Sequence, residues 1–190
     1  MVNLKGKTAL ITGASRGIGR AIAQLYADHG CNVAFTYIYE EQEAASLVME
    51  LQNKGVQVLS INSDAADFEA AHTVVKQVVD TFGSLDILVC NAGIAQDTLL
   101  MRMTEEQWDM VISVNLKSVF NLTKAVQPIM WKQGGGSVIK CLVGEHKGLS
   151  VVALQAEKSV CQGVYALAFK QSKREKFSAG FAHFTAFIVK

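Results

Sequence analysis

Three glycines that lie close together, Gly13, Gly17 and Gly19, could form an anion-binding loop. They follow the apolar run Thr8–Thr12, which predicts a buried strand, and they precede Arg20–His29, whose apolar residues recur with helical spacing. A glycine-rich turn between a strand and a helix presents free backbone N–H groups at the positive end of the helix dipole. This arrangement suits a pyrophosphate, and the alternative is a turn that binds no ligand.

We expect this loop to bind its ligand with backbone more than with side chains. Gly13 permits the tight turn, Gly17 lets the backbone approach the ligand, and Gly19 lets the helix pack closely on the strand. The candidate cofactor-binding residues of the loop are Gly13, Ser15, Arg16, Gly17, Ile18 and Gly19.

Strand and helix patterns alternate along the first two-thirds of the chain. Short apolar runs predict buried strands, and longer periodic segments that end at glycine predict helices. The sequence Thr104–Gln107 fits a capping box that opens one helix, and Leu116–Lys132 predicts another. Further expected strands are Asn32–Tyr37, Val56–Ile61, Leu85–Cys90, Ser137–Val143 and a sixth within Ala179–Lys190, and further expected helices are Glu40–Lys54 and Phe68–Phe82.

This alternation predicts an α/β fold with a parallel sheet covered by helices on both faces. Right-handed crossovers then favour a doubly wound, three-layer Rossmann fold with strand order 3-2-1-4-5. A length of 190 residues predicts a single domain.

Four short motifs, in order along the chain, resemble those of the short-chain dehydrogenases/reductases. "TGASRGIG" at Thr12–Gly19 matches the family's glycine element, and Asp64 matches its acidic residue beside the adenine. "NAG" at Asn91–Gly93 matches the element that stabilises the central sheet beside the cofactor, and Asn115 matches the catalytic-site asparagine. The resemblance therefore adds as cofactor-binding residues Asp64, Ala65, Asn91, Ala92 and Gly93.

The amino-acid sequence of residues 1–139 most resembles the bacterial 3-oxoacyl-[acyl-carrier-protein] reductases, and residues 140–190 diverge from them. This likeness implies a cytoplasmic oxidoreductase of fatty-acid synthesis that reduces a 3-oxoacyl thioester. Its implied partners are a small or acyl-carrier-protein-bound acyl substrate and further copies of the same chain, as a homo-oligomer.

The end of the second expected strand bears on the choice of cofactor. NAD-preferring sites usually place an acidic residue there, whereas a nearby arginine accommodates the 2′-phosphate of NADP. Here the strand ends in Thr36–Tyr37, and Arg16 lies in the glycine loop. The first carboxylates, Glu40 and Glu41, follow several residues later at the expected start of a helix. These residues favour NADP over NAD.

The resemblance breaks down where the family's remaining catalytic residues are expected. The family uses a serine after the fifth strand and a Tyr-x-x-x-Lys pair, in which the tyrosine protonates the carbonyl oxygen and the lysine lowers the tyrosine pKa. The paired serines would fall at Leu142 and Val143, and the tyrosine at Leu154 if Lys158 is the family lysine. The catalytic residues that the resemblance leaves are Asn115 and Lys158.

Composition excludes several other classes of function. A net charge of +1 argues against a nucleic-acid partner. The sequence shows neither a secretory signal nor a run long enough to cross a bilayer, so we expect no membrane partner. The four cysteines lack metal-ligand spacing, so we expect reduced thiols and no metal site, at Cys31, Cys90, Cys141 and Cys161.

Two functions are left open by the sequence. The first is an NADP-dependent reductase, and the second is a catalytically impaired nucleotide-binding module, which includes a truncated or frame-shifted product of a reductase gene. A positioned general acid contributes about 10²–10⁴-fold to a rate, so the missing tyrosine predicts slow turnover.

Overall fold

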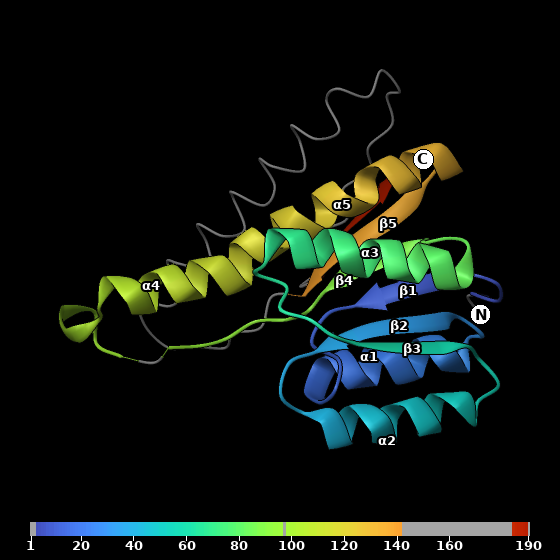
Figure 1. Ribbon diagram of the computed structural model, residues 1–190, viewed down its shortest axis with the longest axis horizontal. Coiled ribbons are helices and arrows are strands. Elements are labelled where there is room, and N and C mark those ends of the chain that lie inside the picture. The colour runs from blue at the N-terminus through green and yellow to red at the C-terminus, as the bar shows by residue number, and fades with distance from the viewer. Residues whose placement is uncertain (1–2, 97, 142–183, 190) are drawn as a thin grey trace.

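A six-stranded sheet in the order β3-β2-β1-β4-β5-β6 forms the centre of the structure (Figure 1). The computed structural model describes residues 3–96, 98–141 and, as backbone, 184–189. The strands are β1 Thr8–Ile11, β2 Asn32–Tyr37, β3 Val58–Asn62, β4 Ile87–Cys90, β5 Gly136–Cys141 and β6 Phe184–Val189.

Strands β1 to β5 are parallel, and their order confirms the one predicted from the alternation. In the register of the sheet, Ile11 lies beside Phe35 on one side and Val89 on the other. The expected sixth strand is present, but β6 runs antiparallel to β5, with Gly136 opposite Val189. The sheet is therefore parallel only as far as β5.

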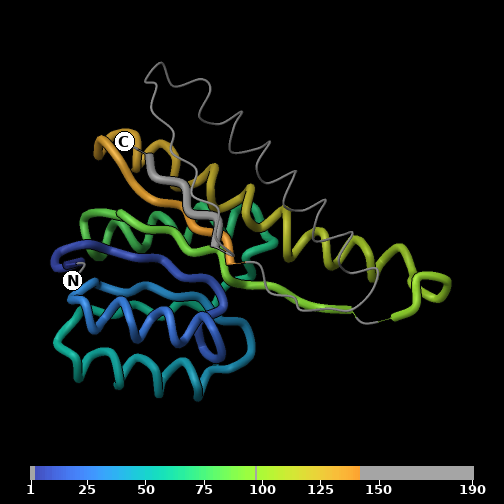
Figure 2. Tube along the Cα trace, turned by 180° about the vertical axis from the view of Figure 1, so that it is seen from behind, coloured from blue at the N-terminus to red at the C-terminus, as the bar shows by residue number. Residues whose placement is uncertain are grey.

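Helices cover both faces of the sheet, which gives the three predicted layers. Helices α1, Gly17–Asp28, and α2, Glu41–Gln52, lie on one face, and α3, Phe68–Phe82, and α5, Ser118–Gln133, lie on the other (Figure 1). Figure 2 shows from behind that α1 and α2 stay together below the strands while α5 runs above them. Leu10 and Val138 are buried under α3 and α5, and the next residues in their strands, among them Ile11, face α1 and α2.

Helix α3 shows how local sequence determines these elements. Asp67 caps its start by accepting a hydrogen bond of 2.8 Å from the Ala70 N–H. Ala71, Val74 and Val78 recur at spacings of three and four residues, and all three are buried. Gly83 ends the helix in the left-handed conformation, with φ of 80°. The predicted bounds of α3 are therefore confirmed.

Other predicted bounds shift by two or three residues. Helix α1 begins at Gly17 instead of Arg20, because the glycine loop itself forms its first turn. Strand β3 occupies Val58–Asn62 instead of Val56–Ile61, and β4 begins at Ile87.

The two helices expected after residue 104 are both present, but they are joined without a break. The capping box at Thr104 opens α4, Glu105–Ile112, as expected. The π-helical turn η2, Ser113–Lys117, then continues without a break into α5. The π turn inserts one extra residue into the helix and so interrupts the apolar periodicity. Such an interruption in the sequence looks like the boundary between two helices.

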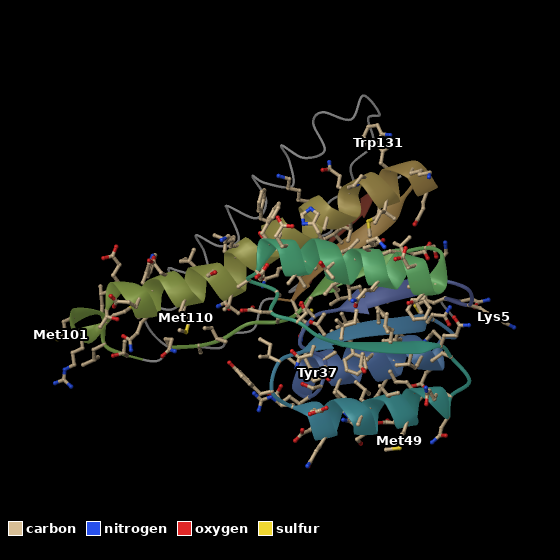
Figure 3. The ribbon with its side chains drawn as sticks, viewed as in Figure 1. Lys5, Tyr37, Met49, Met101, Met110 and Trp131 are labelled. Atoms are coloured by element: carbon tan, nitrogen blue, oxygen red, sulfur yellow. The ribbon has the colours of Figure 1, made fainter. Side chains whose placement is uncertain are left out.

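The carboxyl ends of the parallel strands all face the side from which α4 projects (Figure 1). A short 3₁₀ turn, η1, Leu100–Arg102, lies at the far end of this projection, where Figure 3 labels Met101. The segments that follow β1 and β4 meet at this edge, which is where doubly wound sheets bind their ligands.

Candidate nucleotide-binding site

Two glycines of the loop after β1 hold backbone conformations that favour glycine. Gly13 has φ of 63° and Gly17 has φ of 59°, both in the left-handed region. A Cβ at Gly13 would lie 3.0 Å from the Cα of Ala92, so the loop passes close to the segment after β4. A Cβ at Gly17 would meet no atom of the described residues within 4 Å, so these residues leave this part of the loop open to an approaching ligand.

Gly19 lies where the first turn of α1 packs on the sheet. A Cβ there would lie 2.5 Å from the Nδ2 of Asn91 and 2.6 Å from the carbonyl oxygen of Gly13. Only a residue without a side chain fits this approach, as the sequence predicts for Gly19.

The start of α1 is suited to an anion. Its N-cap residue, Arg16, makes no side-chain capping hydrogen bond, and its first turn contains no acidic residue. The first N–H groups of a helix lack intrahelical partners, and here no described side chain caps them. Ser15 is buried at the base of the loop, whereas Ile18 is half exposed. A pyrophosphate therefore fits this loop by its chemistry and by its open face.

Asn91 fastens the loop to the end of β4. Its Nδ2 donates hydrogen bonds of 2.9 Å to the carbonyl oxygens of both Thr12 and Gly13. The backbone N–H groups of Asn91 and Ala92 donate in return to the Thr12 hydroxyl, at 3.0 and 2.9 Å. Thr12 was not among the predicted site residues, although it opens the glycine motif. These bonds fix the spacing between the two strand ends that border the site.

Asn115 lies in the middle of the π turn η2, and it binds the segment after β4. Its Oδ1 accepts a hydrogen bond of 2.8 Å from the Ile94 N–H, and its Nδ2 donates one of 2.9 Å to the Ile94 carbonyl. A Cβ at Gly93 would lie 3.2 Å from the same Oδ1. Asn115 is therefore bonded to the residue that directly follows Asn91–Gly93, and its side chain lies beside Gly93.

The Asp64–Ala65 segment lies beyond β3 and is held by α5. Asp64 is exposed, and its Oδ1 accepts a hydrogen bond of 2.9 Å from the Ala66 N–H, which closes a turn. Asn121, fully buried, donates from Nδ2 to the carbonyls of Ala65 and Ala66 at 3.3 and 3.0 Å. Sequence reasoning missed Asn121, although a polar residue on the buried stripe of a helix was a signal for it.

Arg16, the predicted reader of a 2′-phosphate, is bound to a carboxylate. Its Nη2 lies 3.2 Å from Oε1 of Glu40, and the Ser15 hydroxyl donates to Oε2 of Glu40 at 3.4 Å. Glu40 sits directly before α2, as the sequence predicts. That its side chain turns back to the glycine loop could not be read from the sequence, because side-chain direction in a connection depends on the tertiary structure.

The described cysteines are buried thiols. Cys31, Cys90 and Cys141 form no disulfide within the described part of the chain. Burial raises the pKa of the Cys31 thiol to about 12, with a smaller contribution from the charge of Asp86, and burial also raises the pKa of Cys141. Such thiols are poor nucleophiles and poor metal ligands at neutral pH.

Residues 3–96 and 98–141 contain no group of three or more His, Cys, Asp or Glu side chains arranged to bind a metal. No helix within the described residues is long and apolar enough to span a bilayer. The expectations about the family serine, tyrosine and lysine positions lie outside the described residues, and these are Leu142, Val143, Leu154 and Lys158.

The sequence model of the short chain dehydrogenases matches residues 7–167. The chain belongs to this family. The match includes the glycine loop, Asn91 and Asn115, and it extends past residue 139, where the expected similarity to the reductases ends.

Two relatives in this family show how much of the chain is shared. A 3-oxoacyl-[acyl-carrier-protein] reductase of Staphylococcus aureus is 49% identical over 133 residues, which are 70% of this chain and 54% of the relative. The corresponding reductase of Vibrio cholerae is 41% identical over 179 residues, which are 94% of this chain and 71% of the relative. The chain thus spans about half the length of the Staphylococcus relative that it matches.

Solved structures of this family share the fold. A short-chain dehydrogenase of Burkholderia cenocepacia, in complex with NADP, has a TM-score of 0.79 at 32% identity, covering 90% of this chain and 71% of the other. A 7α-hydroxysteroid dehydrogenase complexed with NADH also has a TM-score of 0.79, at 28% identity, covering 89% and 68%. Complexes with both nicotinamide cofactors therefore occur among proteins with this fold.

Proposed function

We propose that the described residues bind NADP(H) and that the chain derives from, or acts as, an oxidoreductase that reduces a 3-oxoacyl thioester. The observation that carries this proposal is the glycine loop, which Asn91 fixes to the end of β4. Among the described residues, no side chain caps the helix start beside this loop, and none fills the space at Gly17. The 3-oxoacyl-[acyl-carrier-protein] reductases that resemble this chain support the choice of substrate.

In this proposal three parts of the site bind different groups of the cofactor. The loop from Gly13 to Gly19 binds the pyrophosphate, Asp64 and Ala65 border the adenine, and Arg16 binds the 2′-phosphate. The cofactor, when bound, supplies a hydride. Asn115 positions the backbone at Ile94 through two hydrogen bonds, so that the edge of the sheet beside the reacting centre keeps its shape.

A second candidate function, nucleotide binding without appreciable turnover, is favoured by the sequence after β5. Leu142, Val143 and Leu154 stand where the family's serines and tyrosine are expected, and none of them has a hydroxyl group. Nothing at these positions can protonate the carbonyl oxygen of a substrate, and a general acid contributes about 10²–10⁴-fold. We therefore propose that any reduction by this chain is at least about 10²-fold slower than by a relative with the tyrosine and serine.

One experiment on the purified chain separates the two candidates. Binding of NADPH and NADH is measured by calorimetric titration, and NADPH oxidation is followed with an acetoacetyl thioester. Tight cofactor binding with slow or undetectable oxidation supports the nucleotide-binding module, and turnover near the typical enzyme value of about 10 s⁻¹ supports the reductase.

Arg16→Ala tests the cofactor assignment in the same titration. It should weaken NADPH binding by about 1.5–3 kcal/mol, the worth of a charged hydrogen bond, and change NADH binding little. Equal losses for both cofactors would show that Arg16 does not contact the 2′-phosphate.

A further inference from the structure

The carboxylate of Glu40 forms an ion pair with the guanidinium group of Arg16, which the proposed cofactor site needs for a 2′-phosphate. Both of its oxygens are engaged by the glycine loop, Oε1 with Arg16 at 3.2 Å and Oε2 with the Ser15 hydroxyl at 3.4 Å. The Arg16 side chain is 76% exposed, whereas that of Glu40 is only 25% exposed. The carboxylate is therefore the fixed member of the pair, and the guanidinium is the member that an incoming ligand can reach.

We infer that Glu40 is a specificity-determining residue of the cofactor site, where it competes with a 2′-phosphate for Arg16. This inference rests on the proposed binding of a nicotinamide dinucleotide. A phosphate that binds Arg16 must displace the carboxylate or share the guanidinium with it, and two like charges that share one cation repel each other. Glu40 thus lowers the preference of the site for NADPH over NADH.

The neighbouring charges strengthen this effect. Arg20 is the other arginine of this region, and its Nη2 is bound to Glu50 at 2.9 Å. Its Nη1 donates to the backbone carbonyls of Ser15 and Glu43, at 3.3 and 3.2 Å, so Arg20 is engaged behind the loop. A 2′-phosphate at this corner therefore depends on Arg16.

The first turn of α2 adds negative charge to the same corner. Glu41 and Glu43 follow Glu40 there, and both are exposed. These carboxylates make the local electrostatic potential more negative and so disfavour the binding of any anion, although solvent and salt screen the exposed ones strongly. Within the described residues, Glu40 is the one of the three whose carboxylate contacts side chains of the loop, so its effect on a phosphate should exceed that of its neighbours.

NADH is affected differently, because its ribose carries a hydroxyl group where NADPH carries a phosphate. A hydroxyl can donate a hydrogen bond to a carboxylate, so Glu40 and an unphosphorylated ribose are compatible in charge. Replacing Glu40 by glutamine keeps the length of the side chain and an oxygen for the Ser15 hydroxyl, and it releases the charge of Arg16. The substitution should therefore tighten the binding of NADPH and leave the binding of NADH nearly unchanged.

The test is a set of titrations with NADPH and NADH, at low and moderate salt, on the wild-type chain and on Glu40→Gln. We expect Glu40→Gln to tighten NADPH binding by about three- to fivefold, the upper part of the range for a partly exposed charge contact, and to change NADH binding by less than about twofold. The gain for NADPH should shrink as salt is added. An unchanged ratio of the two affinities would overturn the inference.

Glu41→Gln is the matched control, because it removes the same charge one residue away. It should change NADPH binding clearly less than Glu40→Gln, and an equal change would mean that general charge, and not the contact with Arg16, is responsible. In the Arg16→Ala background the gain from Glu40→Gln should fall to that of Glu41→Gln, because only general charge repulsion is then left, and an undiminished gain would also overturn the inference. If Glu40→Gln does not fold, Glu40→Asp draws the carboxylate away from Arg16 and should give a smaller gain of the same sign.

The outcomes distinguish this inference from the proposed function. If neither cofactor binds the wild-type chain or any variant, then the proposed function is contradicted and the role of Glu40 is overturned with it. If both cofactors bind but Glu40→Gln leaves their ratio unchanged, then only the role of Glu40 is overturned.

Discussion

The ammonium group of Lys140 donates a hydrogen bond of 3.0 Å to the main-chain carbonyl of Asn115. Lys140 lies near the end of β5 and is only 6% exposed, so a charged donor is buried beside the π turn. Within this turn the Ser118 N–H donates to the carbonyl of Ser113, five residues earlier. Lys140 thus ties the last parallel strand to the turn that carries Asn115.

Replacing Lys140 should loosen the π turn. In Lys140→Met the side-chain length is kept but the donor is lost, and a hydrogen bond to a charged group is worth about 1.5–3 kcal/mol. We expect hydrogen exchange of the amides in η2 to accelerate by about ten- to a hundredfold. Lys132→Met, the same change at an exposed lysine of α5, is the control and should leave exchange in η2 unaltered. Equal exchange in both variants would contradict this role.

Gly19→Ala should destabilise the chain through a clash at the base of the loop. The new Cβ would lie within 2.8 Å of three atoms, those of Asn91, Gly13 and Ala14, two of which belong to backbone. Overpacking of this kind costs about 1–3 kcal/mol of the free energy of unfolding, which urea denaturation measures. A variant as stable as the wild type would show that the loop can move away from β4.

Gly17→Ala is the companion variant, because its Cβ would meet no atom of the described residues within 4 Å, whereas its backbone has φ of 59°. We expect it to lower the free energy of unfolding by about 1–2 kcal/mol through backbone strain alone. Its methyl group stands on the open face, so it should also weaken nucleotide binding beyond what the loss of stability explains. Calorimetric titration of the folded variant, below its unfolding range, checks this, and unchanged affinity would place the ligand elsewhere.

Asn121 should matter for the Asp64 turn although it lies in α5. Asn121→Leu removes the donor to two carbonyls and should lower the free energy of unfolding by about 1–3 kcal/mol. Asn121→Asp should lose more at pH 7, because its carboxylate would face the carbonyl oxygens of Ala65 and Ala66. Part of that loss should be regained near pH 4, where a protonated carboxyl can donate. Denaturation at the two pH values tests this, and a loss in Asn121→Asp that is independent of pH would contradict the proposed contact.

Cys31 should make the stability of the chain fall at alkaline pH. Its pKa in the folded state is about 12, above the ordinary value of 9.0, so between these values the unfolded state loses the thiol proton first. The free energy of unfolding then decreases as pH rises, by at most about 1.4 kcal/mol per pH unit from this group. In urea denaturation, the free energy of unfolding of the wild type should therefore fall between pH 8 and pH 10.5 relative to that of Cys31→Ala. A difference that stays constant would show that Cys31 is not buried as described.

Much of the fold was predictable because the signals for it are local. The run Thr8–Thr12, the glycine after it and the periodic segment that follows define one strand, turn and helix without reference to any distant residue. Repetition of this unit, together with the handedness of parallel crossovers, then predicts the order of β1 to β5. The direction of β6 was not predictable, because an apolar run has the same sequence pattern whether it pairs with a parallel or an antiparallel strand.

For the site, the sequence by itself determined which backbone could approach an anion, since Gly13, Gly17 and Gly19 are the residues that permit it. Only the tertiary structure decided which side chains act on that backbone. Glu40 reaches Arg16 across a connection, Asn121 reaches a turn more than fifty residues away in sequence, and Lys140 reaches Asn115 from another strand. The physical reason is that backbone conformation depends on near neighbours, whereas the partner of a charged or amide side chain depends on how the packed layers bring distant segments together.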